Sequence, residues 1–172
     1  VILKNGNKCC EINDIFKIVD DFSRKSGLST YDQKTQIWFW RHLVVRKWYY
    51  TQEIMLIFSI NNLDSWFTSE AKKEVINFLN ELSKKFENIK SIYLLFNSGK
   101  ADIVQWDYNL IYWKPVIKEK LLDYVFEIWP KSFFQTNSAW AEILYQKVLD
   151  LVWKSGWTLL DLYAGTGTIW IL

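Results

Sequence analysis

The sequence predicts an α/β protein in which a central α+β unit precedes the start of a doubly wound, Rossmann-like domain. Helical periodicity alternates with short β-branched runs in the first part of the chain. Near the end, a helical stripe leads into an apolar run and a glycine-rich turn, which is the order of elements in a parallel α/β sheet. We expect the change from the first part to the second to come after Pro115.

The central unit is predicted to contain two amphipathic helices and several strands. Residues 12–26 and 68–87 carry apolar side chains at spacings of three and four, and Gly27 follows the first helix as a left-handed stop. The expected strands are short apolar runs, at residues 37–46, 53–60, 91–96 and 103–112. A short polar and aromatic segment separates the first two strands and favours a hairpin.

The second part is predicted to contain an extended segment, a helix and a final strand. Residues 121–128 are expected to be extended, and the final strand is expected over residues 158–163. The helix is indicated by apolar side chains at helical spacing, Ala141, Leu144, Tyr145, Val148, Leu149 and Val152.

Half of the residues are hydrophobic and 23% are charged, which is typical of a globular protein and argues against a disordered or fibrous chain. The apolar runs, such as residues 54–60, are far shorter than the roughly 18 residues that span a bilayer, and no signal-like segment opens the chain. We therefore expect a cytoplasmic protein with no membrane partner. The formal net charge of +2 does not by itself indicate a nucleic-acid partner, and it does not exclude a local basic patch.

The glycine-rich turn after residues 158–163 is a candidate cofactor loop. Gly165 and Gly167 let backbone N–H groups approach a nucleotide-like ligand closely. Asp161 precedes them, where a carboxylate can orient the loop or reach the ammonium group of a ligand. A tight strand-to-helix turn without a ligand is the plain alternative. A dinucleotide site is another, because glycine at position 170 would complete a G-x-G-x-x-G pattern.

The segment before the predicted last helix combines aromatic and amide side chains. Phe133 and Phe134 are followed by Gln135, and Asn137 stands where a helix N-cap is expected. These side chains suit a flat, polar ligand. The alternative is that the phenylalanines belong to the core and that Asn137 only caps the helix.

Four motifs occur in an order that resembles a known family. They are residues 41–46 (RHLVVR), 100–102 (KAD), 132–137 (SFFQTN) with the following A-E-x-L-Y, and 160–169 (LDLYAGTGTI). This set resembles the RNA (uracil-5-)-methyltransferases, which use S-adenosylmethionine to form 5-methyluridine in ribosomal and transfer RNA. The resemblance covers essentially the whole chain. It implies that residues 1–118 form a central α/β domain and that residues 119–172 begin an S-adenosylmethionine-dependent methyltransferase domain.

The resemblance also implies a cofactor site. Gln135 and Tyr163 would contact S-adenosylmethionine. The loop that contains Asp161, Gly165 and Gly167 would lie beneath it.

On the substrate side, the resemblance implies contacts with RNA. Phe133 and Phe134 would stack on the cofactor or on a base turned out of the RNA, as an enzyme that must extract its target base requires. Arg41 is assigned to the RNA, with a solvated surface charge as the alternative. His42, the only histidine in the chain, is assigned a structural or RNA-side role.

The family uses a cysteine thiolate that adds to C6 of uracil, so that C5 can take the methyl group, and a carboxylate that then removes the C5 proton. The resemblance places both groups beyond residue 172, so we expect no catalytic residue in this chain and no activity from it alone. Cys10 stands where some members have the last of four iron–sulfur ligands. An iron–sulfur cluster is therefore considered only for the full-length protein. A plain thiol is the alternative.

Tryptophan is unusually frequent, with eleven tryptophans against six glycines. Nine of them stand where we expect glycine from the family, namely Trp38, Trp48, Trp106, Trp113, Trp129, Trp140, Trp153, Trp157 and Trp170. We hypothesise that the gene reads UGA as glycine and that these codons have been translated as tryptophan. If the tryptophans are genuine, several would need a positive φ or a place in a packed turn.

The sequence therefore predicts a methyltransferase that acts on C5 of a uridine, in 23S ribosomal RNA in preference to transfer RNA, and that is a monomer. A catalytically silent RNA-binding module and an NAD-dependent oxidoreductase are the alternatives from other functional classes.

Overall fold

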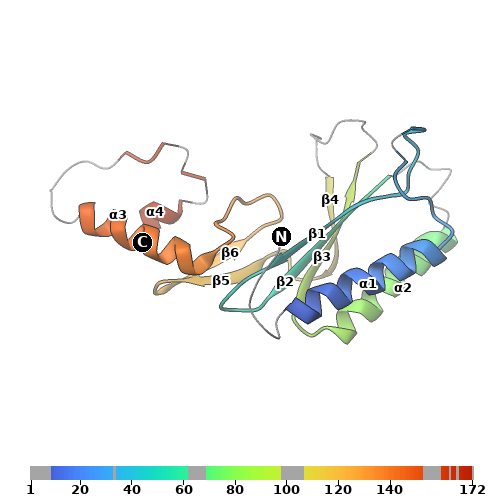
Figure 1. Cartoon of the computed structure of the whole chain (residues 1–172), viewed down its shortest axis with the longest axis horizontal. Helices are drawn as coiled ribbons and strands as arrows, with labels where there is room; N and C mark the ends of the chain where they lie inside the picture. Colours follow the sequence, from blue (N-terminus) through green and yellow to red (C-terminus); the bar gives the residue numbers. More distant parts are fainter. Residues whose placement is uncertain are drawn as a thin grey trace.

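The computed structural model describes residues 9–32, 34–61, 69–97, 107–152, 160–162, 164–165 and 167–171. The elements within these ranges are α1 (Cys9–Lys25), β1 (Trp40–Lys47), β2 (Ile54–Ile60), α2 (Ser69–Lys85), β3 (Ile89–Phe96), β4 (Asp107–Trp113), β5 (Ile117–Leu121), β6 (Tyr124–Ile128), α3 (Ser138–Val152) and α4 (Thr168–Ile171). This mixture of helices and sheets confirms the predicted α/β class (Figure 1). None of the helices in these ranges has the length and apolar character needed to cross a bilayer.

The larger sheet has the strand order β1-β2-β3-β4. β1 and β2 form the predicted antiparallel hairpin, in which Lys47 pairs with Ile54 beside the loop. β2 and β3 are parallel, and α2 provides the crossover that a parallel pair requires. α1 and α2 lie side by side along this sheet, where the rings of Phe22 and Phe78 stack with centroids 3.8 Å apart (Figure 1).

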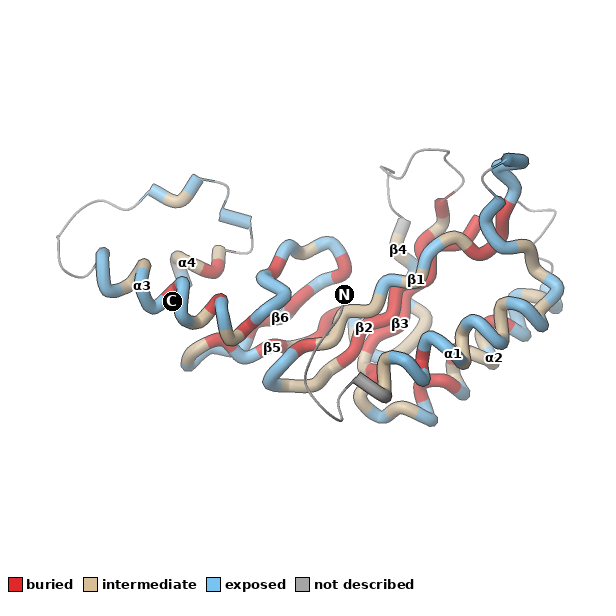
Figure 2. The backbone as a smooth tube through the Cα atoms, in the orientation of Figure 1, coloured by how far each residue is buried: buried red, intermediate tan, exposed pale blue. Residues whose placement is uncertain are grey.

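β2 is buried on both faces, as the tube in Figure 2 shows at the centre of the molecule. Successive strand residues point to opposite faces, so the two faces contribute to different core clusters. The face toward α1 and α2 carries Ile54, Leu56, Phe58 and Ile60. The opposite face contributes Met55 and Ile57 to the second cluster. This double burial explains why the sequence of β2 is apolar at every position except Ser59.

The second core cluster joins the β5–β6 hairpin and α3 to the larger sheet. Its members outside that sheet and its hairpin loop are Ile117, Leu121, Phe126, Ile128, Phe134, Ala141 and Tyr145. The hairpin itself is a separate antiparallel pair of strands. Ala141 and Tyr145 of α3 are therefore covered by the same cluster that covers one face of β2, whereas Leu144, which the sequence analysis placed in the same apolar stripe, is exposed.

Residues 121–128 differ from the prediction of one extended segment. They contain the end of β5, a turn at Leu122 and Asp123, and β6. Leu122 has a φ of 52°, a left-handed conformation that usually calls for glycine or asparagine. The carboxylate of Glu142 accepts the Leu122 N–H at 2.9 Å, so a tertiary contact supports a turn that the local sequence does not signal.

The strand predicted over residues 158–163 lies largely outside the described residues. Leu160 and Asp161 are not in a strand, and Leu162 lies in a turn. A strand needs a neighbour for its backbone N–H and C=O groups, and no described strand pairs with these residues. The doubly wound sheet is therefore not present among the described residues, whose parallel pair is β2–β3. The domain boundary expected between residues 118 and 119 falls within β5.

The tryptophans at the proposed glycine positions differ in their surroundings. Trp38 and Trp48 are buried, whereas Trp129 and Trp140 are exposed. Trp113 is exposed and has a φ of 54°, a backbone conformation that side chains with a Cβ rarely adopt. Positions 106, 153 and 157 and the side chain at position 170 lie outside the described residues. The codon hypothesis stays a prediction.

We expect Trp113→Gly to destabilise the chain less than Trp129→Gly by about 1 kcal/mol. Both variants lose an exposed ring and gain backbone freedom in the unfolded state, but only the first relieves a left-handed conformation. Urea unfolding followed by circular dichroism measures both free energies. Equal losses in the two variants would show that position 113 is not strained.

Candidate functional site

The N-terminal end of α3 is built by the segment that sequence analysis singled out. The Oδ1 atom of Asn137 accepts the N–H of Trp140 at 3.1 Å, so the predicted N-cap is present. Phe134 is buried and packs edge-on against Trp48, with ring centroids 5.2 Å apart. Phe133, in contrast, is 73% exposed, and Gln135 is exposed. The burial of Phe134 favours its core interpretation and leaves Phe133 and Gln135 accessible to a ligand.

Arg46 of β1 fixes the turn that leads into this segment. Its Nη1 atom donates to the carbonyl oxygens of Trp129 at 3.1 Å and Ser132 at 3.0 Å. Burial lowers the pKa of the Arg46 guanidinium from its ordinary value, although not enough to remove its charge. Arg46 therefore has an internal positioning role, which its place in the RHLVVR motif alone does not reveal.

Two carboxylates connect the β1–β2 loop to the β5–β6 hairpin. Glu119 is fully buried and accepts the backbone N–H of Tyr50 at 3.1 Å and that of Thr51 at 3.4 Å. Glu53 accepts the N–H of Lys118 at 2.6 Å. A buried carboxylate is tolerated where several donors satisfy it, so these contacts set the position of the loop relative to the hairpin.

Glu142 of α3 completes this junction. One of its oxygens accepts the Leu122 N–H, and the other accepts the Tyr50 hydroxyl at 2.5 Å. The hydrogen bond to Glu142 is the main cause that raises the pKa of Tyr50 to about 12. The A-E-x-L-Y motif thus contributes a structural carboxylate, which connects α3 with two separate loops.

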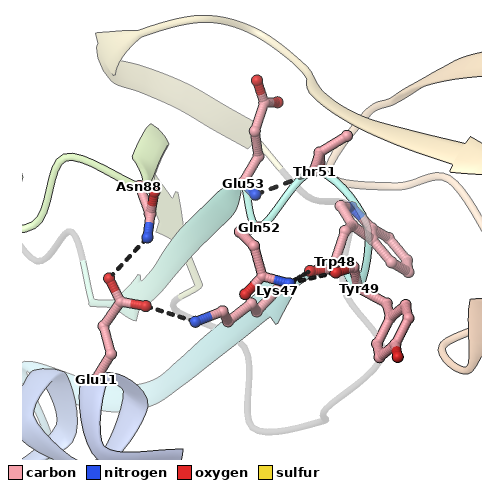
Figure 3. A network of polar contacts seen from close by, with 8 residues as sticks. All are labelled: Glu11, Lys47, Trp48, Tyr49, Thr51, Gln52, Glu53 and Asn88. Carbon is pink, nitrogen blue, oxygen red and sulfur yellow. Dashed lines mark hydrogen bonds and ion pairs between the residues drawn. The ribbon is translucent and has the colours of Figure 1, made fainter. Parts of the chain in front are cut away.

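The β1–β2 loop is also supported from within, as Figure 3 shows. The Gln52 amide nitrogen donates to the carbonyl oxygens of Tyr49 and Trp48 and closes the loop. Beside it, Lys47 forms an ion pair of 2.5 Å with Glu11 of α1, and the Asn88 amide donates to the same carboxylate at 3.1 Å. The loop is therefore held both by its own residues and by α1.

The described part of the glycine turn lies against α3. The Tyr145 hydroxyl is hydrogen-bonded to Thr168, and burial is the main cause that raises the pKa of Tyr145. Ile169 packs on the second core cluster. These contacts hold the start of α4, and with it the glycines that precede it, beside the middle of α3.

Within this turn, Gly165 and Gly167 have φ values of 58° and 72°, the left-handed region that favours glycine. The Oδ2 atom of Asp161 is buried and has no hydrogen-bond partner among the described residues. A buried carboxylate oxygen without a partner is costly, so this atom is suited to receive a donor from a ligand. Tyr163, the other predicted residue of the turn, lies outside the described residues.

Arg41 lies apart from these residues, at the start of β1. Its guanidinium carbon is 5.2 Å from the Tyr31 ring centroid and 4.9 Å from the Trp38 ring centroid. Five strand residues, or about 17 Å, separate it from Arg46. The structure thus places Gln135 and Phe133 at one end of α3 and the glycine turn beside its middle, and it does not place Arg41 with either.

Cys9 and Cys10 begin α1, and their side chains lie outside the described residues. Among the described side chains, no group of three or more histidine, cysteine or acidic residues is arranged to hold a metal ion.

The raised pKa of Tyr50 predicts a specific response to high pH. Because the folded-state pKa of about 12 exceeds the ordinary value near 10, the Tyr50–Glu142 contact stabilises the fold fully below about pH 10 and is lost as the pH rises toward 12. Subtracting the tyrosinate absorbance titration of Tyr50→Phe from that of the wild type isolates this group. In Glu142→Gln the isolated pKa should fall toward its ordinary value. An ordinary pKa in the wild type would contradict the contact.

Comparison with curated proteins finds relatives along nearly the whole chain. The chain is 33% identical over 164 residues to an uncharacterized RNA methyltransferase of Lactococcus lactis subsp. lactis. This match covers 94% of this chain and 34% of the relative. The chain is also 36% identical over 173 residues to an uncharacterized RNA methyltransferase of Clostridium acetobutylicum. This match covers 96% of this chain and 36% of the relative. The chain spans about a third of the length of these relatives. No protein-family model matches this chain.

Among solved structures, the chain is similar to the tRNA (uracil-54, C5)-methyltransferase of Pyrococcus abyssi, crystallised in complex with S-adenosyl-L-homocysteine. The TM-score is 0.72 and the identity 29%, and the match covers 99% of this chain and 39% of that chain. The resemblance read from the ordered motifs is therefore confirmed, and the chain is related along nearly its whole length to a segment of RNA methyltransferases.

Proposed function

We propose that the full-length protein containing this chain transfers a methyl group from S-adenosylmethionine to C5 of a uridine in RNA. The observation that carries this proposal is the structural similarity over 99% of the chain to an enzyme named for C5 methylation of uracil in tRNA. The ordered motifs of the sequence support the same reaction. Of this enzyme, the chain supplies the elements around one side of the cofactor and substrate sites.

The residues of the glycine turn fit S-adenosylmethionine. Asp161 offers a buried carboxylate oxygen with no described partner, which suits the ammonium group of the cofactor. Gly165 is exposed and has a left-handed backbone, so the chain can pass close to a ligand there. When bound, the cofactor supplies an electrophilic methyl group. Tyr163 and Gln135 are proposed as further contacts.

Phe133 is proposed to face the RNA. Its ring is 73% exposed beside Gln135, and an exposed ring of this size gains free energy by stacking on a base. Phe134 is proposed to act only indirectly, since its contacts with Trp48 and Phe126 hold the backbone of Phe133 in place. Arg41 is proposed to contact RNA outside the reacting centre.

The substrate RNA is proposed to be 23S ribosomal RNA, in keeping with the sequence analysis. The name of the structural neighbour points to transfer RNA, so both must be tested. The catalytic cysteine and the proton-accepting carboxylate are proposed to lie in other parts of the full-length protein.

We expect the purified full-length protein to form 5-methyluridine in unmodified 23S ribosomal RNA, using S-adenosylmethionine that carries a labelled methyl group. Nucleoside analysis by mass spectrometry identifies the product, and tRNA transcripts are assayed in parallel. Methylation of tRNA alone would reassign the substrate. Methylation of another base or another atom would overturn the proposed reaction.

We expect Asp161→Asn in the full-length protein to weaken binding of S-adenosylhomocysteine by roughly tenfold to a hundredfold, because the ammonium group loses its charged partner. Asp123→Asn is the matched control, since Asp123 is exposed in the β5–β6 turn. Calorimetric titration measures both affinities. Equal affinities for the two variants would remove Asp161 from the cofactor site.

A further inference from the structure

An exposed lysine stands at the corner of the turn that leads into the segment of Phe133. Pro130 and Lys131 are the two central residues of this turn, which the Ser132 N–H closes by donating to the Trp129 carbonyl oxygen at 3.0 Å. The Ser132 hydroxyl in turn accepts the Trp129 N–H at 3.3 Å. Pro130 is buried, whereas Lys131 is exposed. The turn therefore presents the lysine to solvent.

Arg46 fixes both ends of this turn. Its Nη1 atom donates to the carbonyl oxygens of Trp129 and Ser132, which lie on either side of Lys131 in the chain. These hydrogen bonds use main-chain oxygens, so they form equally well with glycine at position 129. Because one charged group holds two carbonyl groups, the turn has little freedom. The backbone of Lys131 is thus held in place before any ligand binds.

The Lys131 ammonium group lies over an aromatic ring of β4. Its Nζ atom is 5.2 Å from the ring centroid of Tyr108. Tyr108 is half-buried, packs on the second core cluster and contacts the Tyr93 ring edge-on, with centroids 5.8 Å apart. A cation–π contact at an exposed site is weak, but it favours one direction among the many that a lysine side chain can adopt. We call Arg46, Tyr108 and Lys131 the cation cluster.

No carboxylate of the described residues pairs with either cation of this cluster. Lys131 contacts the ring of Tyr108, and Arg46 contacts carbonyl oxygens. Burial raises the pKa of the Tyr108 hydroxyl, and the nearby charge of Arg46 opposes this effect. By contrast, Lys47 and Lys118 are each paired with a glutamate. The cation cluster therefore has a positive potential that no described side chain neutralises.

The cation cluster lies beside the ring that is proposed to face the RNA. Phe133 follows Lys131 by two residues, so their Cα atoms are at most roughly 7 Å apart. Phe133 is 73% exposed. Proteins bind single-stranded nucleic acid by combining exposed rings, which stack on bases, with positive charges that follow the phosphates. The described residues around Phe133 provide both.

We propose that Lys131 binds a phosphate group of the substrate RNA, next to the nucleotide whose base stacks on Phe133. The inference rests on the proposed function for the identity of the substrate. Tyr108 holds the ammonium group beside the turn, and Arg46 adds to the attraction from within the fold. Lys131 is a substrate-binding residue in this arrangement and takes no part in the methyl transfer itself.

The chemistry of lysine favours a phosphate over a base edge as its ligand. Its ammonium group is a compact point charge that lacks the fixed fork with which arginine reads a base. A phosphate contact fixes the register of the strand and carries no sequence information. Lys131 should therefore contribute to the affinity for any single-stranded RNA, and this contribution should fall as salt rises.

The test measures binding of the full-length protein to a fluorescein-labelled oligouridylate of roughly ten nucleotides, a length typical of single-strand binding sites. Fluorescence anisotropy gives the affinity at several salt concentrations. Lys131→Ala should weaken binding about fivefold at low salt. It should also make the slope of log affinity against log salt shallower by about 0.7, the value for one phosphate contact in a single strand. Lys131→Arg, which keeps the charge, should retain the slope.

Lys73→Ala is the matched control. Lys73 is an exposed lysine of α2, which covers the opposite face of the sheet from Tyr108. Its removal should change neither the affinity nor the slope. Tyr108→Leu should weaken binding by about twofold and leave the slope unchanged, because the charge remains and only its support is lost. Urea unfolding checks that each variant is folded.

An unchanged slope in Lys131→Ala, or an equal change in Lys73→Ala, would overturn the inference. So would an oligouridylate affinity too weak to measure in the wild type. A loss confined to binding of S-adenosylhomocysteine would also overturn it, because Lys131 would then bind the carboxylate of the cofactor. If Lys131→Ala shows the shallower slope but the wild type forms no 5-methyluridine, the proposed function fails while the phosphate contact stands.

Discussion

The junction between the β1–β2 loop and the β5–β6 hairpin depends on carboxylates that bind backbone N–H groups. Glu119 is buried beneath the loop, Glu53 reaches the start of the hairpin, and Glu142 reaches both from α3. Charge-assisted hydrogen bonds of this kind are directional, so they fix a relative position that apolar packing alone would leave loose. The position of the segment that carries Phe133 and Gln135 depends on this junction.

Apolar packing also stabilises this junction. One face of β2 is covered by α1 and α2, and the other by the cluster that includes Phe134 and Tyr145. Burial supplies most of the free energy in such contacts but little direction, whereas the carboxylates supply direction. Trp48 belongs to both systems, because its ring packs in the cluster and its carbonyl oxygen accepts the amide of Gln52.

The sequence predicted those elements whose signals are local. The apolar run of β2, the helical spacing of α1 and α2, and the N-cap at Asn137 all follow from nearby residues. The turn at Leu122 did not, because its left-handed backbone is supported by Glu142, which lies twenty positions later.

The candidate site shows the same division. The motifs singled out Asp161 and the glycines as candidates, since a carboxylate and a glycine-rich turn each have a chemical role that can be read from a few neighbouring residues. They did not separate the exposed Phe133 from the buried Phe134, and they did not reveal that Arg46 binds two backbone carbonyl groups. Adjacent residues in an irregular segment have no fixed period from which burial can be read.

Helix α3 sets the distance between the two groups of residues that are proposed to meet the cofactor. About 10 Å of helix separates Ser138, which follows the segment of Phe133 and Gln135, from Tyr145, which supports the glycine turn. A ligand that contacts both Gln135 and the glycine turn must therefore extend over about two turns of this helix. This geometry favours an elongated cofactor over a compact one.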